Sequence, residues 1–400
     1  MPQLWAGIDA GKSHHHCVVI DEAGARLLSR SLANDEDELL ALLGDVTELA
    51  DGHPVVWATD LNQGGAALLI AVLAANGQEM LYIPGRTVHR AARTYRGDGK
   101  TDAKDAAIIA DQARMRRDLH PVRAGDEIAT ELRMLAAHRA DLVADRTRAI
   151  NRLRVTLLEY FPGLEAAFDF AQRKAALVLL TKYQTPAQLR RSGVTRITTW
   201  LRNEGCRQPE KIAEDAVAAA NRQRTVVTGQ DAAALIVERL AREVLRLKEE
   251  VEAVDAQIDA RFRRHEWAET LLSIPGFGPL LASEFIGATG GTTRYFENAN
   301  RLAGVAGVAP VPRDSGRISG NLHRPKRYDR RLMRACYVSA EVAARSHPES
   351  RAYYDRKRAE GKRHKQAVLA LARRRINVIW ALLRDGTTYQ QQSIAARTAA

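Results

Sequence analysis

Short apolar runs, several of them alternating with polar positions, characterise the N-terminal part of the chain. Short runs bounded by turn residues are typical of strands, and they predict five strands, at 4–9, 16–21, 26–32, 55–60 and 80–83. The turn at 22–24 is short enough to join the second and third strands as an antiparallel hairpin. Leucine-rich and alanine-rich segments at about 35–50 and 64–76 predict helices between the later strands.

This order of elements, three hairpin strands followed by alternating helix and strand, predicts an α/β domain of the RNase H-like (RuvC-like) type over residues 1–125. A doubly wound dinucleotide-binding domain would begin strand–helix–strand and would need G-x-G-x-x-G after the first strand, which is absent. The G-K-S sequence at 11–13 resembles the end of a P-loop. Ala6 stands where that motif requires glycine, so we expect no ATP binding. The histidines at 14–16 would point to alternate faces of a strand, so we expect strand residues rather than metal ligands.

The remainder of the chain is predicted to be mainly helical. A long helix over about 126–160, stopped at Pro162, opens a helical linker region over 126–230. Apolar residues then recur in alternating steps of three and four, at Val237, Leu240, Val244, Leu247, Val251, Val254 and Ile258. This a/d spacing predicts a coiled coil over 231–265 that joins copies of the chain into a homo-oligomer. An antiparallel helical hairpin within one chain is the alternative.

A helical C-terminal domain is predicted over 266–385, followed by a disordered tail at 386–400. It opens with a Pro-Gly-Phe-Gly turn between two apolar helices, which resembles a helix-hairpin-helix motif. In such a turn the backbone around Gly276 and Gly278 can bind a nucleic-acid phosphate. A turn that only joins two packed helices is the alternative.

Four aspartates stand at positions suited to a metal site. Asp9 and Asp60 each close a predicted strand, and Asp102 and Asp105 share one face of a predicted helix start. Taken singly, each has a structural explanation as a turn residue, a helix-terminal charge or an ion-pair partner. Taken together, they predict a catalytic oxygen cage for Mg²⁺. Two such ions about 3.5–4 Å apart can stabilise the attacking and leaving oxygens of a phosphoryl transfer.

Charge is distributed unevenly along the chain. The formal net charge is +12 and the pI is about 9.8, which favours a polyanionic partner. Residues 1–60 hold 3 lysines and arginines against 11 acidic residues, whereas residues 313–375 hold 19 against 6. The surplus of positive charge therefore lies toward the C-terminus and predicts nucleic-acid binding there.

The three cysteines show no spacing typical of a metal site or a disulfide framework. We therefore expect reduced thiols and a cytoplasmic protein. No signal peptide is evident, and no apolar run approaches the roughly 18 residues that a membrane helix needs, so we expect no membrane association.

A Ser-Gly pair flanked by arginines lies in the predicted loop at 307–320. Ser315 stands between Arg313 and Arg317, whose guanidinium groups can neutralise a phosphate and stabilise developing charge. The pattern suits a serine nucleophile, and a loop that only binds phosphate is the alternative. Further residues predicted to bind nucleic acid are Arg324, Lys326, Arg327, Arg330 and Arg331. Residues 356–375 are also rich in lysine and arginine, with aromatic residues close by, as in a nucleic-acid channel.

In these features the chain resembles the DEDD-type transposases, or recombinases, of IS110-type insertion sequences, a family of RNA-guided serine recombinases. The resemblance covers about 4–165 and 268–345, and its most specific stretches are 7–12, the strand ending at Asp60, 100–106, 274–279 and 307–316. It implies a RuvC-like domain whose carboxylates bind Mg²⁺ and a transposase domain whose serine forms a covalent phosphoserine link to DNA. It also implies a structured guide RNA and an active site shared between the subunits of a dimer or tetramer.

By position, Ser315 matches the family's serine, although Ser319 and Gly320 form a second Ser-Gly pair. The second acidic residue of the family's motif is glutamate. Asp60 stands at that position in this chain, and its shorter side chain implies a ligand that acts through water. We therefore predict an insertion-sequence transposase that cuts and rejoins DNA with Mg²⁺ and a serine nucleophile. The alternatives are a RuvC-like Holliday-junction endonuclease that uses water, and a non-enzymatic nucleic-acid-binding scaffold.

Overall fold

The computed structural model of the chain describes residues 3–95, 99, 101–122, 126–294 and 296–390. Of the tail predicted to be disordered, 391–400 therefore lies outside the described residues, whereas Tyr389 packs on the protein and donates its amide to Ser273 Oγ at 2.8 Å. The chain divides into two compact units, Met1–Glu127 and Ile128–Ala400, which are treated separately. None of the described helices is long and apolar enough to cross a membrane.

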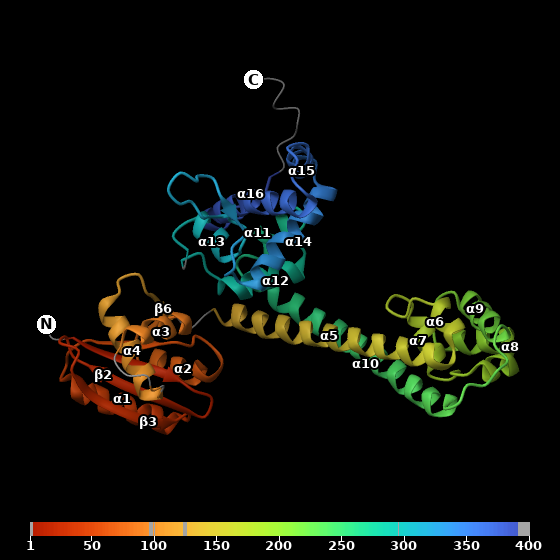
Figure 1. Ribbon diagram of the computed structural model, residues 1–400, viewed down its shortest axis with the longest axis horizontal. Coiled ribbons are helices and arrows are strands. Elements are labelled where there is room, and N and C mark those ends of the chain that lie inside the picture. Colours follow the sequence, from red (N-terminus) through yellow and green to blue (C-terminus); the bar gives the residue numbers. More distant parts are fainter. Residues whose placement is uncertain (1–2, 96–98, 100, 123–125, 295, 391–400) are drawn as a thin grey trace, which may run out of the picture. The chain divides into compact units, whose positions relative to one another are not determined.

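The first unit is built on a mixed six-stranded sheet (Figure 1). Its strands are β1 (Leu4–Ala10), β2 (His14–Ile20), β3 (Arg26–Ala33), β4 (Val55–Thr59), β5 (Met80–Tyr82) and β6 (His120–Val122). They lie in the order β3-β2-β1-β4-β5-β6; β4 runs parallel to β1 and to β5, and the other neighbours are antiparallel. The five predicted strands and their hairpin are confirmed, although β2 begins two residues earlier than predicted. The short β6 contains a proline and gave no strand pattern in the sequence.

Helices cover both faces of this sheet. On one face, α1 (Glu36–Ala50), the 3₁₀ turn η1 (Gly64–Ala66) and α2 (Ala67–Ala75) bury Ile8 and Cys17. On the other face, α3 (Gly85–Ala91), the 3₁₀ turn η2 (Ala92–Thr94) and α4 (Asp102–Met115) lie over Trp5 and Val18. Because successive side chains of a strand alternate between faces, Asp9 lies on the same face as Trp5, toward α4.

Gly7 sets the distance between β1 and α4. A Cβ atom at this position would lie 2.3 Å from both the carbonyl oxygen of Ala106 and the amide nitrogen of Ala110, so a larger residue would push the helix away. Thr101 caps α4 by accepting a hydrogen bond from the amide of Lys104 at 3.2 Å. The first turn of α4 is therefore held beside the end of β1.

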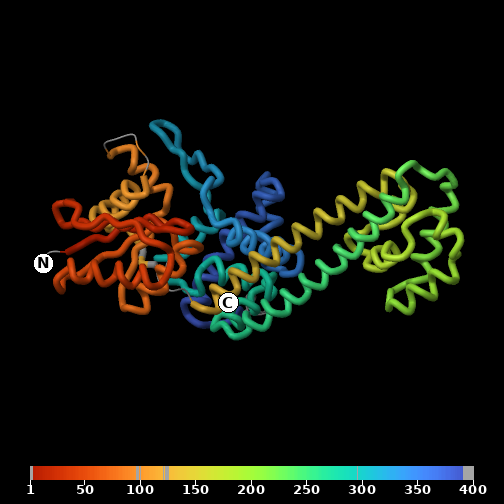
Figure 2. The backbone as a smooth tube through the Cα atoms, turned by 90° about the horizontal axis from the view of Figure 1, so that it is seen from below, coloured from red at the N-terminus to blue at the C-terminus, as the bar shows by residue number. Residues whose placement is uncertain are grey.

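The second unit is mainly helical, and two long helices run side by side through it (Figures 1 and 2). These are α5 (Glu127–Tyr160), which confirms the long helix predicted at 126–160, and α10 (Gln230–Phe262). One end of the pair carries α6 (Pro162–Ala167), α7 (Lys174–Leu180), α8 (Pro186–Asn203) and α9 (Pro209–Asn221). The other end carries α11 (Ala268–Ser273), α12 (Pro279–Thr289), α13 (Ala299–Val305), the strands β7 (Val311–Pro312) and β8 (Leu322–His323), α14 (Arg330–Ser346), α15 (Pro348–Ala359) and α16 (His364–Asp385).

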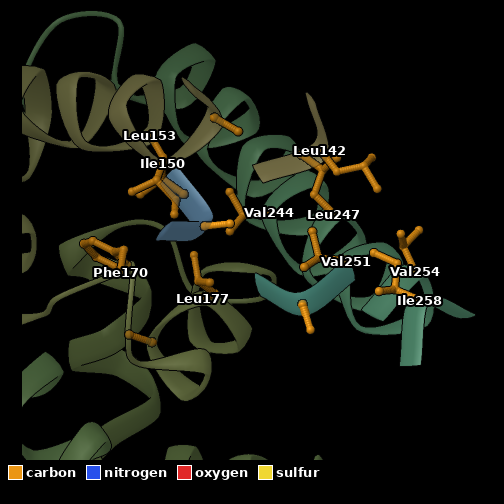
Figure 3. Close-up of a cluster of buried hydrophobic side chains, with 14 of the residues drawn as sticks. Leu142, Ile150, Leu153, Phe170, Leu177, Val244, Leu247, Val251, Val254 and Ile258 are labelled. Carbon is orange, nitrogen blue, oxygen red and sulfur yellow. The ribbon is translucent and has the colours of Figure 1, made fainter. Parts of the chain in front are cut away.

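The apolar seam of α10 is buried inside the chain. All seven seam residues from Val237 to Ile258 are at most 7% exposed, and they cluster with Leu142, Ile150 and Leu153 of α5 (Figure 3). Ion pairs join the two helices at Arg261–Glu131 (3.0 Å) and Arg152–Glu243 (3.6 Å), a register in which the helices run antiparallel. The seam therefore forms a helical hairpin within one chain rather than the predicted coiled coil between copies, because helices of the same chain, α5 and α7 among them, already cover it.

Candidate functional site

The four predicted metal-binding aspartates line one cavity of about 450 Å³ in the first unit. Asp9 is on β1 and Asp60 directly follows β4, and these two neighbouring strands are parallel, so both residues lie at the same edge of the sheet. Asp102 and Asp105 are in the first turn of α4. The fold thus brings together residues that are more than 90 positions apart in the sequence.

The environment of Asp60 disfavours its negative charge. Burial raises the pKa of the Asp60 carboxyl group, and the nearby charge of Asp105 raises it further. A weak hydrogen bond from the amide of Ala10 to Asp60 Oδ1, 3.4 Å long, acts in the opposite direction. Two carboxylates that repel each other in a half-buried cavity would be stabilised by a bound cation.

The donor chemistry of the cavity suits a hard divalent cation, because carboxylate oxygens are the ligands that Mg²⁺ prefers. The carboxyl groups of the four aspartates are spaced more widely than the ligands of a closed metal site. Within the described residues, no group of three or more His, Cys, Asp or Glu side chains is arranged so that it could hold a metal ion. Binding would therefore require these side chains to move closer around the ion.

Several other side chains line the same cavity and were not among the predicted site residues. His89 on α3 and Arg93 on η2 are four positions apart, a spacing that places them on one helix face and could have marked them in the sequence. Lys104 also lines it, from α4. The cavity therefore carries basic side chains beside the four aspartates.

The three adjacent histidines of β2 are confirmed as strand residues, and their surroundings differ. His15 is 2% exposed, and burial lowers its pKa. Burial also lowers the pKa of His16, while the charge of Asp102 opposes that shift. His16 Nε2 lies 3.0 Å from Ser29 Oγ. His16 is thus the histidine of β2 that lies near the aspartate cluster.

Ser315 lies at the tip of an exposed β-hairpin in the second unit. Its amide donates to the carbonyl of Ile318 at 3.2 Å, and the amide of Ile318 donates back at 3.0 Å, which closes a two-residue turn over Gly316 and Arg317. Gly316 has φ +54°, a left-handed conformation that glycine adopts readily. The hydrogen-bond ladder continues at Arg313, whose backbone amide donates to the carbonyl of Asn321 at 2.9 Å. The predicted serine and its two arginines therefore share one hairpin end, exposed to solvent.

The predicted basic residues that follow the hairpin have unequal surroundings. Arg324 donates to the hydroxyl of Tyr328 at 2.9 Å, and Arg331 donates to the carbonyl of Arg133 on α5 at 3.1 Å. All five predicted basic residues of this segment are exposed, including Lys326, Arg327 and Arg330. Arg324 and Arg331 therefore also support the local fold, while the segment as a whole keeps a cationic surface.

The Pro-Gly-Phe-Gly turn is packed against other helices of the second unit. Gly276 has φ +84°, and a Cβ atom there would lie 2.2 Å from the carbonyl oxygen of Ser339 on α14. Arg375 on α16 donates a hydrogen bond to the carbonyl of Pro275. Gly278 precedes α12 as its N-cap. These contacts explain the glycine at 276 by helix packing, which is the simpler alternative to phosphate binding.

Comparison with known proteins gives two family matches. One family model, DEDD_Tnp_IS110, described as a transposase, matches residues 6–162, and another, described as the transposase IS116/IS110/IS902 family, matches residues 268–355. The insertion element IS900 uncharacterized 42 kDa protein of Mycobacterium paratuberculosis is 61% identical over 98% of both chains. The IS116 uncharacterized 44.8 kDa protein of Streptomyces clavuligerus is 48% identical over 99% of this chain and 98% of its own. The mini-circle putative transposase for IS117 of Streptomyces coelicolor is 28% identical over 97% of this chain and 96% of its own.

An acidic cavity on an α/β unit and a basic helical unit in one chain define a class of proteins that act on nucleic acid. Within that class, this chain belongs to the IS116/IS110/IS902 family of insertion-sequence transposases, so the resemblance seen in the sequence is confirmed. The matched segments contain all the predicted catalytic residues: the aspartates lie in the first and Ser315 in the second.

Proposed function

We propose that this transposase cuts and rejoins DNA with the aspartate cluster of a RuvC-like first unit and with Ser315 as the nucleophile. The observation that carries the proposal is the convergence of Asp9, Asp60, Asp102 and Asp105 on one cavity, in a chain of a transposase family. The order of strands in the sheet supports the RuvC-like assignment.

In this proposal the four aspartates would hold Mg²⁺, and the bound ion would supply positive charge to the phosphate during phosphoryl transfer. The raised pKa of Asp60 supports a cation there, since a cation would favour its charged form. His89 and Arg93 bind and orient the DNA phosphate beside the aspartates.

Ser315 carries the covalent step. Its Oγ loses a proton and attacks the phosphorus of a DNA phosphodiester; the Oγ–P bond forms, the P–O3′ bond breaks, and the released O3′ takes up a proton. Arg313 and Arg317 neutralise the phosphate, and the exposed hairpin end gives DNA access to the serine. A 3′ hydroxyl of a partner strand then attacks the phosphoserine, restores the phosphodiester and frees Ser315.

The proposed partners are the DNA of the element ends and target, a structured guide RNA, and further copies of the chain as a dimer or tetramer. Because α5 covers the seam at 237–258, association of copies would use other surfaces. The surplus of positive charge over 313–375 supports contact with nucleic acid.

A trap for the covalent intermediate tests the proposal. The full chain, its co-expressed RNA and Mg²⁺ are incubated with DNA that carries the element's junction, followed by denaturing electrophoresis and peptide mass mapping. We expect a DNA adduct on the peptide that contains Ser315. Cleaved DNA without an adduct would instead support a hydrolytic Holliday-junction endonuclease, which needs only the carboxylates and water.

A further inference from the structure

A second cavity, of about 410 Å³, lies in the C-terminal part of the second unit. Side chains of α15 and α16 line it, together with Ile274 after α11 and Tyr389 after α16. The residues used in the proposed cutting chemistry do not line this cavity. Its volume is in the range of small-ligand sites.

Two arginines of this cavity are held by an aromatic ring. The guanidinium carbons of Arg356 and Arg374 lie 5.0 and 4.9 Å from the ring centroid of Tyr353, within the range of a cation–π contact. Across the described ranges, neither arginine forms an ion pair with a carboxylate. The neighbouring Arg351, by contrast, pairs with Asp355 at 2.9 Å. The ring therefore positions two guanidinium groups without neutralising them.

A third arginine of the cavity is buried. Arg375 is 7% exposed, and its Nη2 donates to the carbonyl of Pro275, while its Nε has no hydrogen-bond acceptor among the described residues. Burial lowers the pKa of Arg375 to about 10. A buried cation without a charged partner is costly, and an anion nearby would reduce that cost.

The charged side chains that line the cavity give it a net positive charge. Glu349 is the one carboxylate among the described residues that line it, against the three arginines. The ring of Tyr389 packs edge-on against His347, with centroids 5.7 Å apart. The cavity thus combines an excess of fixed positive charge with aromatic rings, the two features with which proteins bind single-stranded nucleic acid.

We propose that this cavity binds one unpaired nucleotide of an RNA or DNA strand, with its phosphate on Arg356 and Arg374. Base stacking on an aromatic side chain requires a base that is not already stacked in a duplex, so a single strand is the expected ligand. The site is separate from the cutting chemistry and depends on neither the aspartates nor Ser315.

Binding of short strands to the full chain tests this inference. Fluorescence anisotropy would follow a 12-nucleotide uridine strand, a 12-nucleotide thymidine strand and a 12-base-pair duplex, in EDTA and at several salt concentrations. Arg356→Gln and Arg374→Gln should each weaken single-strand binding roughly tenfold, and each should reduce the salt slope by about 0.7. Glu349→Gln should strengthen binding, because it removes a negative charge beside the phosphate.

Arg351→Gln is the matched control. It removes the same charge, from the helix that also carries Arg356, but lies outside the cavity, so binding should stay within about twofold of the wild type. The proposal would be overturned if Arg351→Gln weakened single-strand binding as much as the cavity variants do, or if the cavity variants did not weaken it. It would also be overturned if the cavity variants weakened duplex binding as much as single-strand binding. A larger loss for the uridine or the thymidine strand would identify RNA or DNA as the natural source. Circular dichroism and thermal unfolding would establish that each variant is folded.

Photo-crosslinking locates the bound strand. An oligonucleotide that carries a 5-iodopyrimidine reacts with nearby aromatic side chains, and we expect adducts on peptides that contain Tyr353 or Tyr389. Adducts confined to other regions would contradict the inference. Because EDTA abolishes metal-dependent cutting, a failure of the proposed serine chemistry would leave these binding results unchanged, and the two proposals fail separately.

Discussion

A Cβ atom on Gly7 would lie 2.3 Å from the carbonyl oxygen of Ala106, so strand β1 and helix α4 meet backbone to backbone. This contact holds the first turn of α4, with Asp102 and Asp105, beside the strand that carries Asp9. The geometry of the aspartate cluster therefore depends on a residue with no side chain of its own.

Replacement of Gly7 by alanine should displace α4. Overpacking of this kind costs about 1–3 kcal/mol of unfolding free energy, and hydrogen exchange of α4 peptides should rise as DNA cutting falls. Gly44→Ala is the control, because Gly44 is an exposed helix residue of α1 with no atom within 4 Å of the added Cβ. That change should stabilise the protein by about 0.5–1 kcal/mol. If hydrogen exchange of α4 were the same in Gly7→Ala as in the wild type, the helix would have adapted to the added methyl group.

Asp60→Asn should have opposite effects on stability and activity. The folded state raises the pKa of Asp60, so its ionisation costs stability as pH rises through that raised value, and the cost is absent below the ordinary value of 3.8. In EDTA, thermal unfolding should therefore show Asp60→Asn to be more stable than the wild type at neutral pH, with the difference vanishing in acid.

Mg²⁺ should narrow that difference by stabilising the wild type more than the variant, and DNA cutting by Asp60→Asn should fall about a hundredfold or more. The exposed Asp141→Asn is the control and should change stability by no more than about 0.5 kcal/mol at any pH. If Mg²⁺ stabilised both proteins equally, Asp60 would not be part of the metal site.

The two Ser-Gly pairs of the hairpin can be separated by parallel substitutions. Ser315→Ala should abolish the covalent DNA adduct and strand exchange, because it removes the attacking oxygen, and DNA binding should remain within about twofold of the wild type. Ser319→Ala should retain adduct formation. Denaturing electrophoresis of trapped complexes checks both, and the reverse pattern would make Ser319 the nucleophile.

The buried seam predicts a stability effect that does not depend on protein concentration. Leu247→Ala should lower the unfolding free energy by about 2–5 kcal/mol, because Leu247 is 3% exposed in the α5–α10 core. Leu235→Ala, on the same helix but 70% exposed, should change it by about 0.5 kcal/mol at most. Thermal unfolding at several protein concentrations distinguishes a seam buried within one chain from a seam shared between copies. A shared seam would make the loss of stability depend on protein concentration.

Local patterns were enough to predict several parts of the fold and the candidate site. Alternation and turn residues predicted the strand that carries Asp9 and the strand that Asp60 directly follows, and the i,i+3 spacing placed Asp102 and Asp105 on one helix face. The hairpin that presents Ser315 was expected only as a loop, because its strands are two residues long and its ladder continues through isolated contacts. His89 and Arg93 were overlooked, since their relation to the aspartates arises only when α3 and α4 pack on the same face of the sheet.

The sequence by itself determined where five of the strands lie along the chain, the positions of the four aspartates, the heptad spacing of α10 and the basic C-terminal half, because each is a property of neighbouring residues. Only the tertiary structure decided that α5 of the same chain covers the seam, that Gly276 is required by packing against α14, and that Tyr353 gathers arginines from two helices around a cavity. Periodicity shows that a helix has an apolar or charged face, whereas the partner of that face is chosen by packing among segments distant in the chain.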